Sequence, residues 1–394
     1  MGASGTTRIC LPPLIIWTVV AIWSAMMVWY AIASGVQHDY GEYLAQWALV
    51  REHANPWATN NAYGPLHNLF AYFLPLGPLA PKLVTAAVLL TANALLVAEL
   101  CRERAGVDAF VVYLVAVPAN ILVVSLGFGY GLNDGLVAAL VLFALLARRR
   151  QHFGRAGCLL GLAVLLKYYP AVLIPLFALD AGRVRLRLIA GAAAVTAIGL
   201  AAGWLAWGSA LFQPLIFGVE REPKMLSILS ALSSYPHLIG GESVLAVLLH
   251  SNAAFVAGAS LIVVLIAWRT RMHWIEASVI GLLAVLLTYK VGHPQFYLPW
   301  AFLVAALPLT KAPSADRLAW ICLPMLLFLS AFQWGYAYGS DGYREVLGNI
   351  RRDVGFVAFA LGVATVAACA LQRWSLGRSA IAPRRVSPNR DSGY

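Results

Sequence analysis

Charged residues are scarce in this chain. Asp, Glu, Lys and Arg make up only 11% of its 394 residues, and 61% are hydrophobic; soluble domains are roughly 25% charged. The mean hydropathy is +0.76. This shortage of charge excludes an ordinary soluble domain. It predicts an all-α polytopic membrane protein, because a helix of about 20 apolar residues spans the hydrocarbon core.

Cysteine is rare as well, with five residues at Cys10, Cys101, Cys158, Cys322 and Cys369. Their spacing indicates neither a disulfide framework nor a zinc site. No dense group of histidines and carboxylates demands a metal, so we expect no cofactor, and the need for a divalent metal stays open. The first apolar run is longer than the core of a signal peptide and predicts an uncleaved first helix.

The long apolar runs predict the membrane segments. They cover 11–33, 82–100, 108–126, 132–147, 156–180, 188–208, 250–268, 274–290, 295–310, 317–336 and 353–371. We expect about 10 spanning helices plus one re-entrant pair of half-helices, about 12 membrane segments in all. They form a single domain over residues 1–372, and residues 373–394 form a basic, disordered cytoplasmic tail.

The basic residues explain the net charge of +11. With the N-terminus inside, most of the 28 Lys and Arg residues fall on the inner side, as the positive-inside rule requires. Both termini are therefore predicted to be cytoplasmic. A polyanionic partner is not needed, and no nucleic acid is expected.

Segment 156–180 has arginines before it and after it, so both of its ends belong inside. Lys167 and Pro170 interrupt the run in its middle. Each half is then about 11 residues, or roughly 16 Å long, too short to span. This pattern favours a re-entrant pair with Lys167 at its tip, lining a protein-enclosed cavity. A single kinked spanning helix is the alternative.

Polar residues gather at the predicted outer ends. Asp39, Glu42 and Gln46 recur on one side of a short amphipathic helix, with Tyr40, Tyr43 and Trp47 on its other side at the headgroup level. A solvated polar face without function is the alternative. Further along the chain lie Asn133 and Asp134 at a helix start, and then Lys290, His293 and Gln295 in an outer turn. Capping and snorkelling are their simpler interpretations.

The order of these motifs resembles a known family. The acidic helix is followed by Asn55-Pro56-Trp57, Tyr63-Gly64-Pro65-Leu66, Gly131-Leu132-Asn133-Asp134, "AGCLLGLAVLLKYYPAVLIP" and "HPQFYLPW". This series is similar to the polyprenyl-phosphate-sugar-dependent glycosyltransferases of the GT-C superfamily, and especially to glycosyltransferase family 87. That family includes mannosyltransferases of lipoglycan and phosphatidylinositol mannoside assembly and an arabinosyltransferase. The resemblance covers roughly residues 10–310.

The resemblance implies an inverting transfer, with mannose favoured, from a polyprenyl-phosphate sugar to a lipid-linked or glycan acceptor at the outer face of the plasma (inner) membrane. Its partners are the donor, the acceptor and membrane lipids. Asp39 occupies the place of the catalytic base, and Glu42 is the other candidate. Fixed cations stabilise a leaving phosphate best, so the donor phosphate is assigned to Lys167, Lys290 and His293. The substrate contacts are assigned to Tyr63, Asn133, Asp134, Tyr168, Gln295 and Tyr297.

Two other interpretations stay open. A secondary transporter also has about a dozen segments and broken helices, although no second broken segment matches the first one here. A structural subunit leaves the outer carboxylates unexplained. The charged stretch Glu220, Arg221, Glu222 and Lys224 is interpreted as a solvated face rather than a catalytic one.

Overall fold

The structure is a computed structural model that describes residues 11–58, 62–74, 77–131, 133–180, 182–339 and 353–371. The predicted tail 373–394 lies outside them. The longer helices are α1 (Pro13–Ala33), α2 (His38–Arg51), α3 (Pro65–Phe73), α4 (Ala80–Arg102), α5 (Val107–Ala116), α6 (Asn133–Arg149), α7 (Phe153–Leu166), α8 (Leu173–Ala178), α9 (Leu186–Trp207), α10 (Gln213–Glu220), α11 (Ile228–Ser234), α12 (Glu242–His250), α13 (Asn252–Arg269), α14 (Trp274–Thr288), α15 (Leu298–Ala306), α16 (Pro313–Tyr338) and a final helix over Asp353–Leu371.

Short elements connect these helices. A π-helix covers Val123–Gly129, and 3₁₀ turns cover Pro56–Ala58, Tyr169–Val172, Gly208–Phe212, Pro236–Ile239, Pro294–Tyr297 and Leu307–Thr310. Strand β1 (Leu179–Asp180) pairs antiparallel with β2 (Arg183–Val184), and β3 (Lys224–Met225) pairs parallel with β4 (Val291–Gly292). The described chain is therefore helical apart from two minimal strand pairs.

The helices confirm a polytopic membrane protein but include fewer long segments than predicted. Six in the described ranges are long and apolar enough to cross a bilayer: Pro13–Ala33, Ala80–Arg102, Leu186–Glu220, Asn252–Arg269, Ser314–Tyr338 and Asp353–Leu371. The bent pair of Val123–Gly129 and Asn133–Arg149 would make a seventh. Other predicted segments are short apolar helices, namely Val107–Ala116, Phe153–Leu166, Tyr169–Ala178 and Trp274–Thr288. Length and composition thus support six or seven of the about ten expected spans.

The short helices lie in the interior of the bundle. Every residue of α15 is buried, and so are most residues of α6 and α14. Trp300 of α15 donates from Nε1 to the carbonyl of Val279 in α14 at 3.0 Å. A helix that faces protein on all sides is as apolar as one that faces lipid. This is why apolar runs alone overcount the spans.

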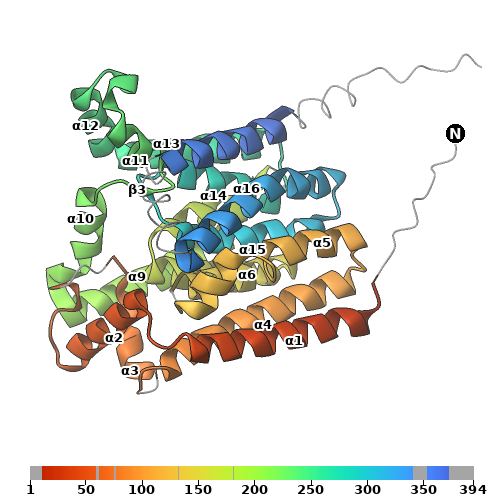
Figure 1. Cartoon of the computed structure of the whole chain (residues 1–394), viewed down its shortest axis with the longest axis horizontal. Coiled ribbons are helices and arrows are strands. Elements are labelled where there is room, and N and C mark those ends of the chain that lie inside the picture. The colour runs from red at the N-terminus through yellow and green to blue at the C-terminus, as the bar shows by residue number, and fades with distance from the viewer. Residues whose placement is uncertain are drawn as a thin grey trace, which may run out of the picture.

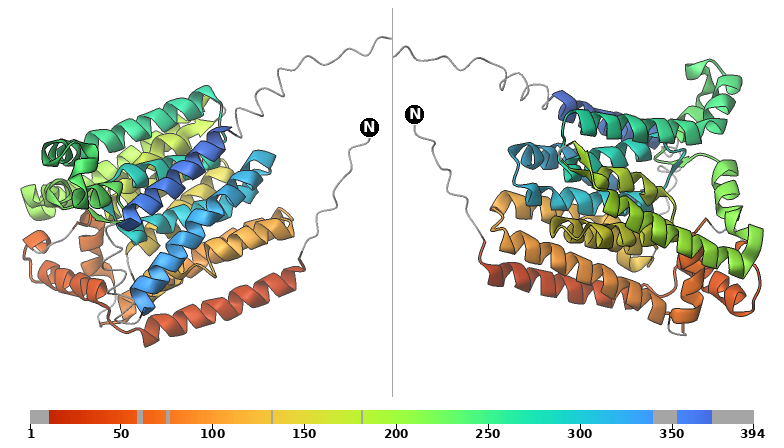
Figure 2. Two further views of the ribbon diagram at one scale, coloured as in Figure 1. Left: turned by 45° about the horizontal axis from the view of Figure 1, so that its top comes forward. Right: turned by 180° about the vertical axis from the view of Figure 1, so that it is seen from behind.

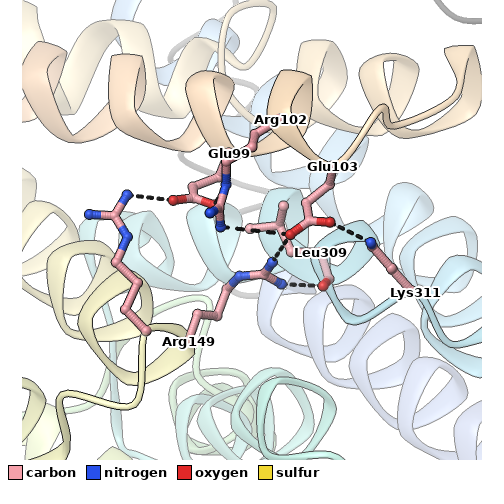
Figure 3. A network of polar contacts seen from close by, with 7 residues as sticks. Glu99, Arg102, Glu103, Arg149, Leu309 and Lys311 are labelled. Atoms are coloured by element: carbon pink, nitrogen blue, oxygen red, sulfur yellow. Dashed lines mark hydrogen bonds and ion pairs between the residues drawn. The ribbon is translucent and has the colours of Figure 1, made fainter.

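The bundle has two chemically different ends. The long helices run in a common direction, and α2, α3 and α10 gather at one end, at the left in Figure 1. Helix α1 lies along one edge of the bundle in both further views (Figure 2). At the opposite end, where α4 and α6 finish, Glu103 accepts from Arg149 at 2.7 Å and also pairs with Lys311 (Figure 3). We call the end with α2, α3 and α10 the polar end, and the end with Glu103, Arg149 and Lys311 the basic end.

Helices α7 and α8 form a hairpin that starts and finishes at the basic end. Arg148 at the end of α6 donates to the carbonyls of Phe177 and Leu179, close to the end of α8. The same guanidinium lies 5.6 Å from the ring of Phe153, the first residue of α7. The chain therefore enters and leaves this hairpin at the same end, and its tip lies deep in the bundle.

Candidate active site

The tip of the hairpin is fixed by a backbone contact from the first loop. Helix α7 ends at Leu166, and Lys167 has an extended backbone with φ −148° and ψ 139°. The last carbonyls of a helix have no partner within it. The amide of Gly64 donates to the carbonyl of Leu166 at 2.9 Å and supplies one. A 3₁₀ turn over Tyr169–Val172, with Pro170 near its start, follows the break, so the break is defined on both sides.

Gly64 is required here by space rather than by backbone angle. Its φ is −75°, which other residues adopt readily. A Cβ at this position would lie 2.2 Å from the carbonyl oxygen of Leu165. The close approach brings Tyr63 over the tip, with the Lys167 ammonium 4.9 Å from the ring centroid.

Gly64→Ala is therefore expected to lower the free energy of unfolding by about 1–3 kcal/mol, the usual cost of overpacking. The physical reason is that backbone, not a movable side chain, stands in the way. Thermal unfolding of the reconstituted protein measures it. Gly154→Ala in α7 is the matched control, since a Cβ there meets nothing within 4 Å. Equal stability of the two variants would contradict the tight contact.

Lys167 is buried and paired. Its ammonium lies 2.6 Å from Asp134 Oδ2, and the two side chains are 6% and 0% exposed. The hydroxyl of Tyr169 donates to the other oxygen of Asp134 at 3.3 Å. The ring of Phe296 lies 4.8 Å from the ammonium. The single charge of Lys167 is thus balanced by one carboxylate, and among the described residues one of its three N–H groups is donated, to Asp134.

A cavity of about 680 Å³ opens beside Lys167. Its polar part is lined by Asp39, Glu42, Tyr43, Tyr63, Lys167, Tyr168, Tyr169, Arg221, Tyr289, Lys290, His293 and Gln295. These residues come from α2, the following loop, the hairpin tip, the end of α10 and the turn after α14. Segments far apart in the sequence therefore meet at one space.

The remainder of the cavity is mostly apolar. Helix α13 contributes Ala253, Val256, Ala257 and Ser260, and α10 contributes Leu215 and Val219. The positions on α13 recur at helical spacing and cover one face of that helix. From Asn252 to Ser260 this face extends about 12 Å along the helix axis. The cavity thus joins a charged chamber to an apolar groove, which we define by these α10 and α13 residues.

Helix α2 carries the two predicted carboxylates into the chamber. Asp39 is half-buried and Glu42 is exposed. The prediction that Tyr40, Tyr43 and Trp47 lie at the lipid headgroups is wrong, since these side chains are 1–3% exposed. Their rings pack against protein and fix the rotation of the helix, so its carboxylates face the cavity.

Arg221 is a cavity residue that the sequence analysis missed. Its guanidinium donates to His293 Nε2 at 2.6 Å. Burial lowers the pKa of Arg221, and Tyr289, Tyr63 and Asp39 oppose that effect, so Asp39 lies within electrostatic reach. The interpretation as a solvated face is therefore wrong for Arg221, although Glu220 and Glu222 are exposed. No local pattern marks this arginine, because it stands between two exposed glutamates.

His293 does not supply a positive charge. Burial, with Arg221 and two lysines nearby, lowers its pKa to about 3. Because arginine only donates, Nε2 of His293 accepts and the ring proton sits on Nδ1. The residue was expected among the cations that face a phosphate. It is a neutral side chain that orients Arg221.

Strand pairing holds the segment after Arg221 against the turn that carries Lys290, and the amide of Lys224 donates to the carbonyl of Lys290 at 3.1 Å. In the β3–β4 pair Lys224 aligns with Val291 and Met225 aligns with Gly292. A Cβ on Gly292 would lie 2.2 Å from the amide nitrogen of Ser227, so only glycine permits this approach. Lys290 is 6% exposed and donates to the carbonyl of Val219. Within the described ranges, neither Lys290 nor Arg221 pairs with a carboxylate.

Most predicted site residues meet at the cavity. Its lining includes Asp39, Glu42, Tyr63, Lys167, Tyr168, Lys290, His293 and Gln295. Asn133, Asp134 and Tyr297 are absent from it. Asn133 contacts His67, Asp134 pairs with Lys167, and Tyr297 is 1% exposed within the core. These three were expected to contact substrate, but they lie behind the cavity wall.

Comparison with known proteins places the chain in a family. Residues 61–288, more than half of the chain, match Glycosyltransferase family 87. No similar protein was found among those with curated functions. The matched region contains Lys167, Asp134 and Arg221. A match to a glycosyltransferase family does not fit the interpretation as a secondary transporter. The chain is therefore a multi-pass membrane glycosyltransferase that belongs to glycosyltransferase family 87.

Proposed function

We propose that the enzyme transfers a sugar, with mannose favoured, from a polyprenyl-phosphate donor to a hydroxyl of a lipid-linked or glycan acceptor. The observation that carries this proposal is the cavity, in which carboxylates, cations and an apolar groove share one space. The prenyl chain occupies the groove along α13. The phosphate lies beside Lys167, Arg221 and Lys290.

The reaction is a single displacement with inversion. Asp39 takes the proton of the acceptor hydroxyl, whose oxygen forms a bond to the anomeric carbon. The bond from that carbon to the phosphate oxygen breaks, and its electron pair leaves with the polyprenyl phosphate. The donor is a phosphodiester with one negative charge, whereas the product monoester carries up to two. Arg221 and Lys290 favour this gain of charge, because fixed cations act most strongly where water is scarce.

The chamber faces the outer side of the plasma membrane in this proposal, and both termini are cytoplasmic. Support comes from the basic end, where Arg102, Arg149, Arg150 and Lys311 lie around Glu99 and Glu103. Such clusters favour the inner side. The α7–α8 hairpin is then re-entrant from the inside, with its tip at the chamber.

The test is sugar transfer by the purified protein in lipid vesicles, with a panel of short-chain polyprenyl-phosphate sugars and membrane-lipid acceptors. We expect transfer of one sugar, and a product with the anomeric configuration opposite to that of the donor. Retention of configuration would refute the single displacement. Absence of both donor binding and transfer across the panel would refute the proposed substrate class.

Arg221→Gln is expected to raise the KM for donor by about 10-fold to 100-fold, because a hydrogen bond to a charged group is worth about 1.5–3 kcal/mol. The measurement is the initial rate against donor concentration. Arg187→Gln is the control, since Arg187 is exposed and lies at the start of α9. If both variants leave the KM unchanged, Arg221 does not hold the phosphate.

A further inference from the structure

A line of buried hydrogen bonds runs from α2 to α6 behind the cavity. His67 of α3 is 0% exposed. Its Nε2 lies 3.0 Å from Gln46 Oε1, and its Nδ1 lies 2.5 Å from Asn133 Nδ2. An amide nitrogen only donates, so Nδ1 accepts, and Nε2 carries the proton and donates to Gln46. The imidazole of His67, with its proton on Nε2, therefore joins α2 to α6.

The two ends of this line belong to different parts of the chamber. Gln46 lies two helical turns after Asp39 on α2. Asn133 directly precedes Asp134, which pairs with Lys167. His67 thus stands between α2, which carries Asp39, and α6, whose Asp134 pairs with Lys167.

The imidazole is held rigidly. The rings of Tyr43, Trp47 and Tyr63 lie 5.0, 5.3 and 4.7 Å from it, and Trp47 Nε1 donates to the carbonyl of His67 at 2.8 Å. Burial lowers the pKa of His67 to about 3, and Lys167 adds to this effect. The ring is therefore neutral at physiological pH, and it is absent from the residues that line the cavity.

We propose that His67 is a positioning residue that sets the distance between the carboxylate of α2 and the ammonium of Lys167. The inference rests on the proposed function, in which these two groups act on acceptor and donor. His67 does not touch substrate. It acts through Gln46 and Asn133, and a shift of α2 by about 1 Å is enough to cost up to 100-fold in rate.

The first test compares His67→Phe with His67→Gln. Phenylalanine keeps the ring packing and removes both polar atoms, whereas the glutamine amide can replace the Nε2–H donor. We expect His67→Phe to lower kcat at least about tenfold with the donor KM within about twofold, and His67→Gln to regain most of the rate. In both variants the acid limb of the profile of rate against pH should lie at the same pH as in wild type. His237→Phe is the control, because His237 is exposed.

Three results would overturn the proposal: an unchanged kcat in His67→Phe, an equal loss in both variants, or an acid limb that moves in His67→Gln. A second measurement needs no activity. Hydrogen exchange of the α2 amides should accelerate in Asn133→Ala, because Asn133 reaches α2 through His67. Wild-type exchange in that variant would refute the link. If wild type transfers no sugar, the proposed function fails, and the exchange measurement still decides the role of His67.

Discussion

Asp39→Asn is expected to lower sugar transfer at least about 100-fold while donor binding stays within about threefold of wild type. A sugar hydroxyl is a poor nucleophile, and removal of its proton by a placed base contributes typically about 10²–10⁴-fold. The amide keeps the size of the side chain and removes the basic oxygen. Rates with saturating acceptor, together with binding of a short-chain polyprenyl-phosphate sugar, measure the two effects separately.

Glu42→Gln is the matched variant, since Glu42 lies one turn further along α2 and also lines the cavity. We expect it to keep most of the rate. Asp39 is half-buried and its charge reaches Arg221, whereas Glu42 is exposed. If Glu42→Gln abolishes transfer and Asp39→Asn does not, the base is Glu42. If both variants kept the full rate, neither carboxylate of α2 would be the catalytic base.

The second large effect concerns the buried pair of Lys167 and Asp134. Asp134→Asn and Lys167→Met are each expected to lower the free energy of unfolding by about 3–5 kcal/mol, because each leaves one buried charge without its partner. The double variant removes both charges and should regain much of that loss. Its transfer rate should stay at least about 100-fold below wild type, since the phosphate has lost Lys167.

Asp180→Asn provides the comparison. Asp180 pairs with Arg185, but these side chains are 32% and 40% exposed, so this change should cost no more than about 1 kcal/mol. Thermal unfolding of all four variants in one lipid gives the ranking. A double variant no more stable than either single one would mean that the charges do not compensate each other. A double variant with wild-type activity would mean that Lys167 has no part in transfer.

The sequence predicted the cavity better than it predicted the segments. Asp39 and Lys167 could be found because a charge in an apolar chain is costly and therefore informative. The number of spans could not, because α6, α14 and α15 are apolar through contact with protein. Composition does not distinguish a helix that is apolar because it faces protein from one that is apolar because it faces lipid.

Residue roles were least predictable where they depend on pairing across the chain. Arg221 is indistinguishable from a solvated arginine until β3 pairs with β4 and brings it to His293. Asp134 was expected to contact substrate. It lies behind the cavity wall instead, where it pairs with Lys167. In both cases the deciding contact joins segments at least 33 residues apart, which no local pattern encodes.

The network around Glu103 at the basic end has a consequence for the biogenesis of the protein. Glu103 and Arg149 can meet once α6 has been synthesised, whereas Lys311 is added only after all the cavity-lining residues have been synthesised. Early helices are thus joined first, and the late segment before α16 completes the same carboxylate site (Figure 3). The ion-pair network opposite the chamber is therefore completed only after every residue that lines the cavity has been synthesised.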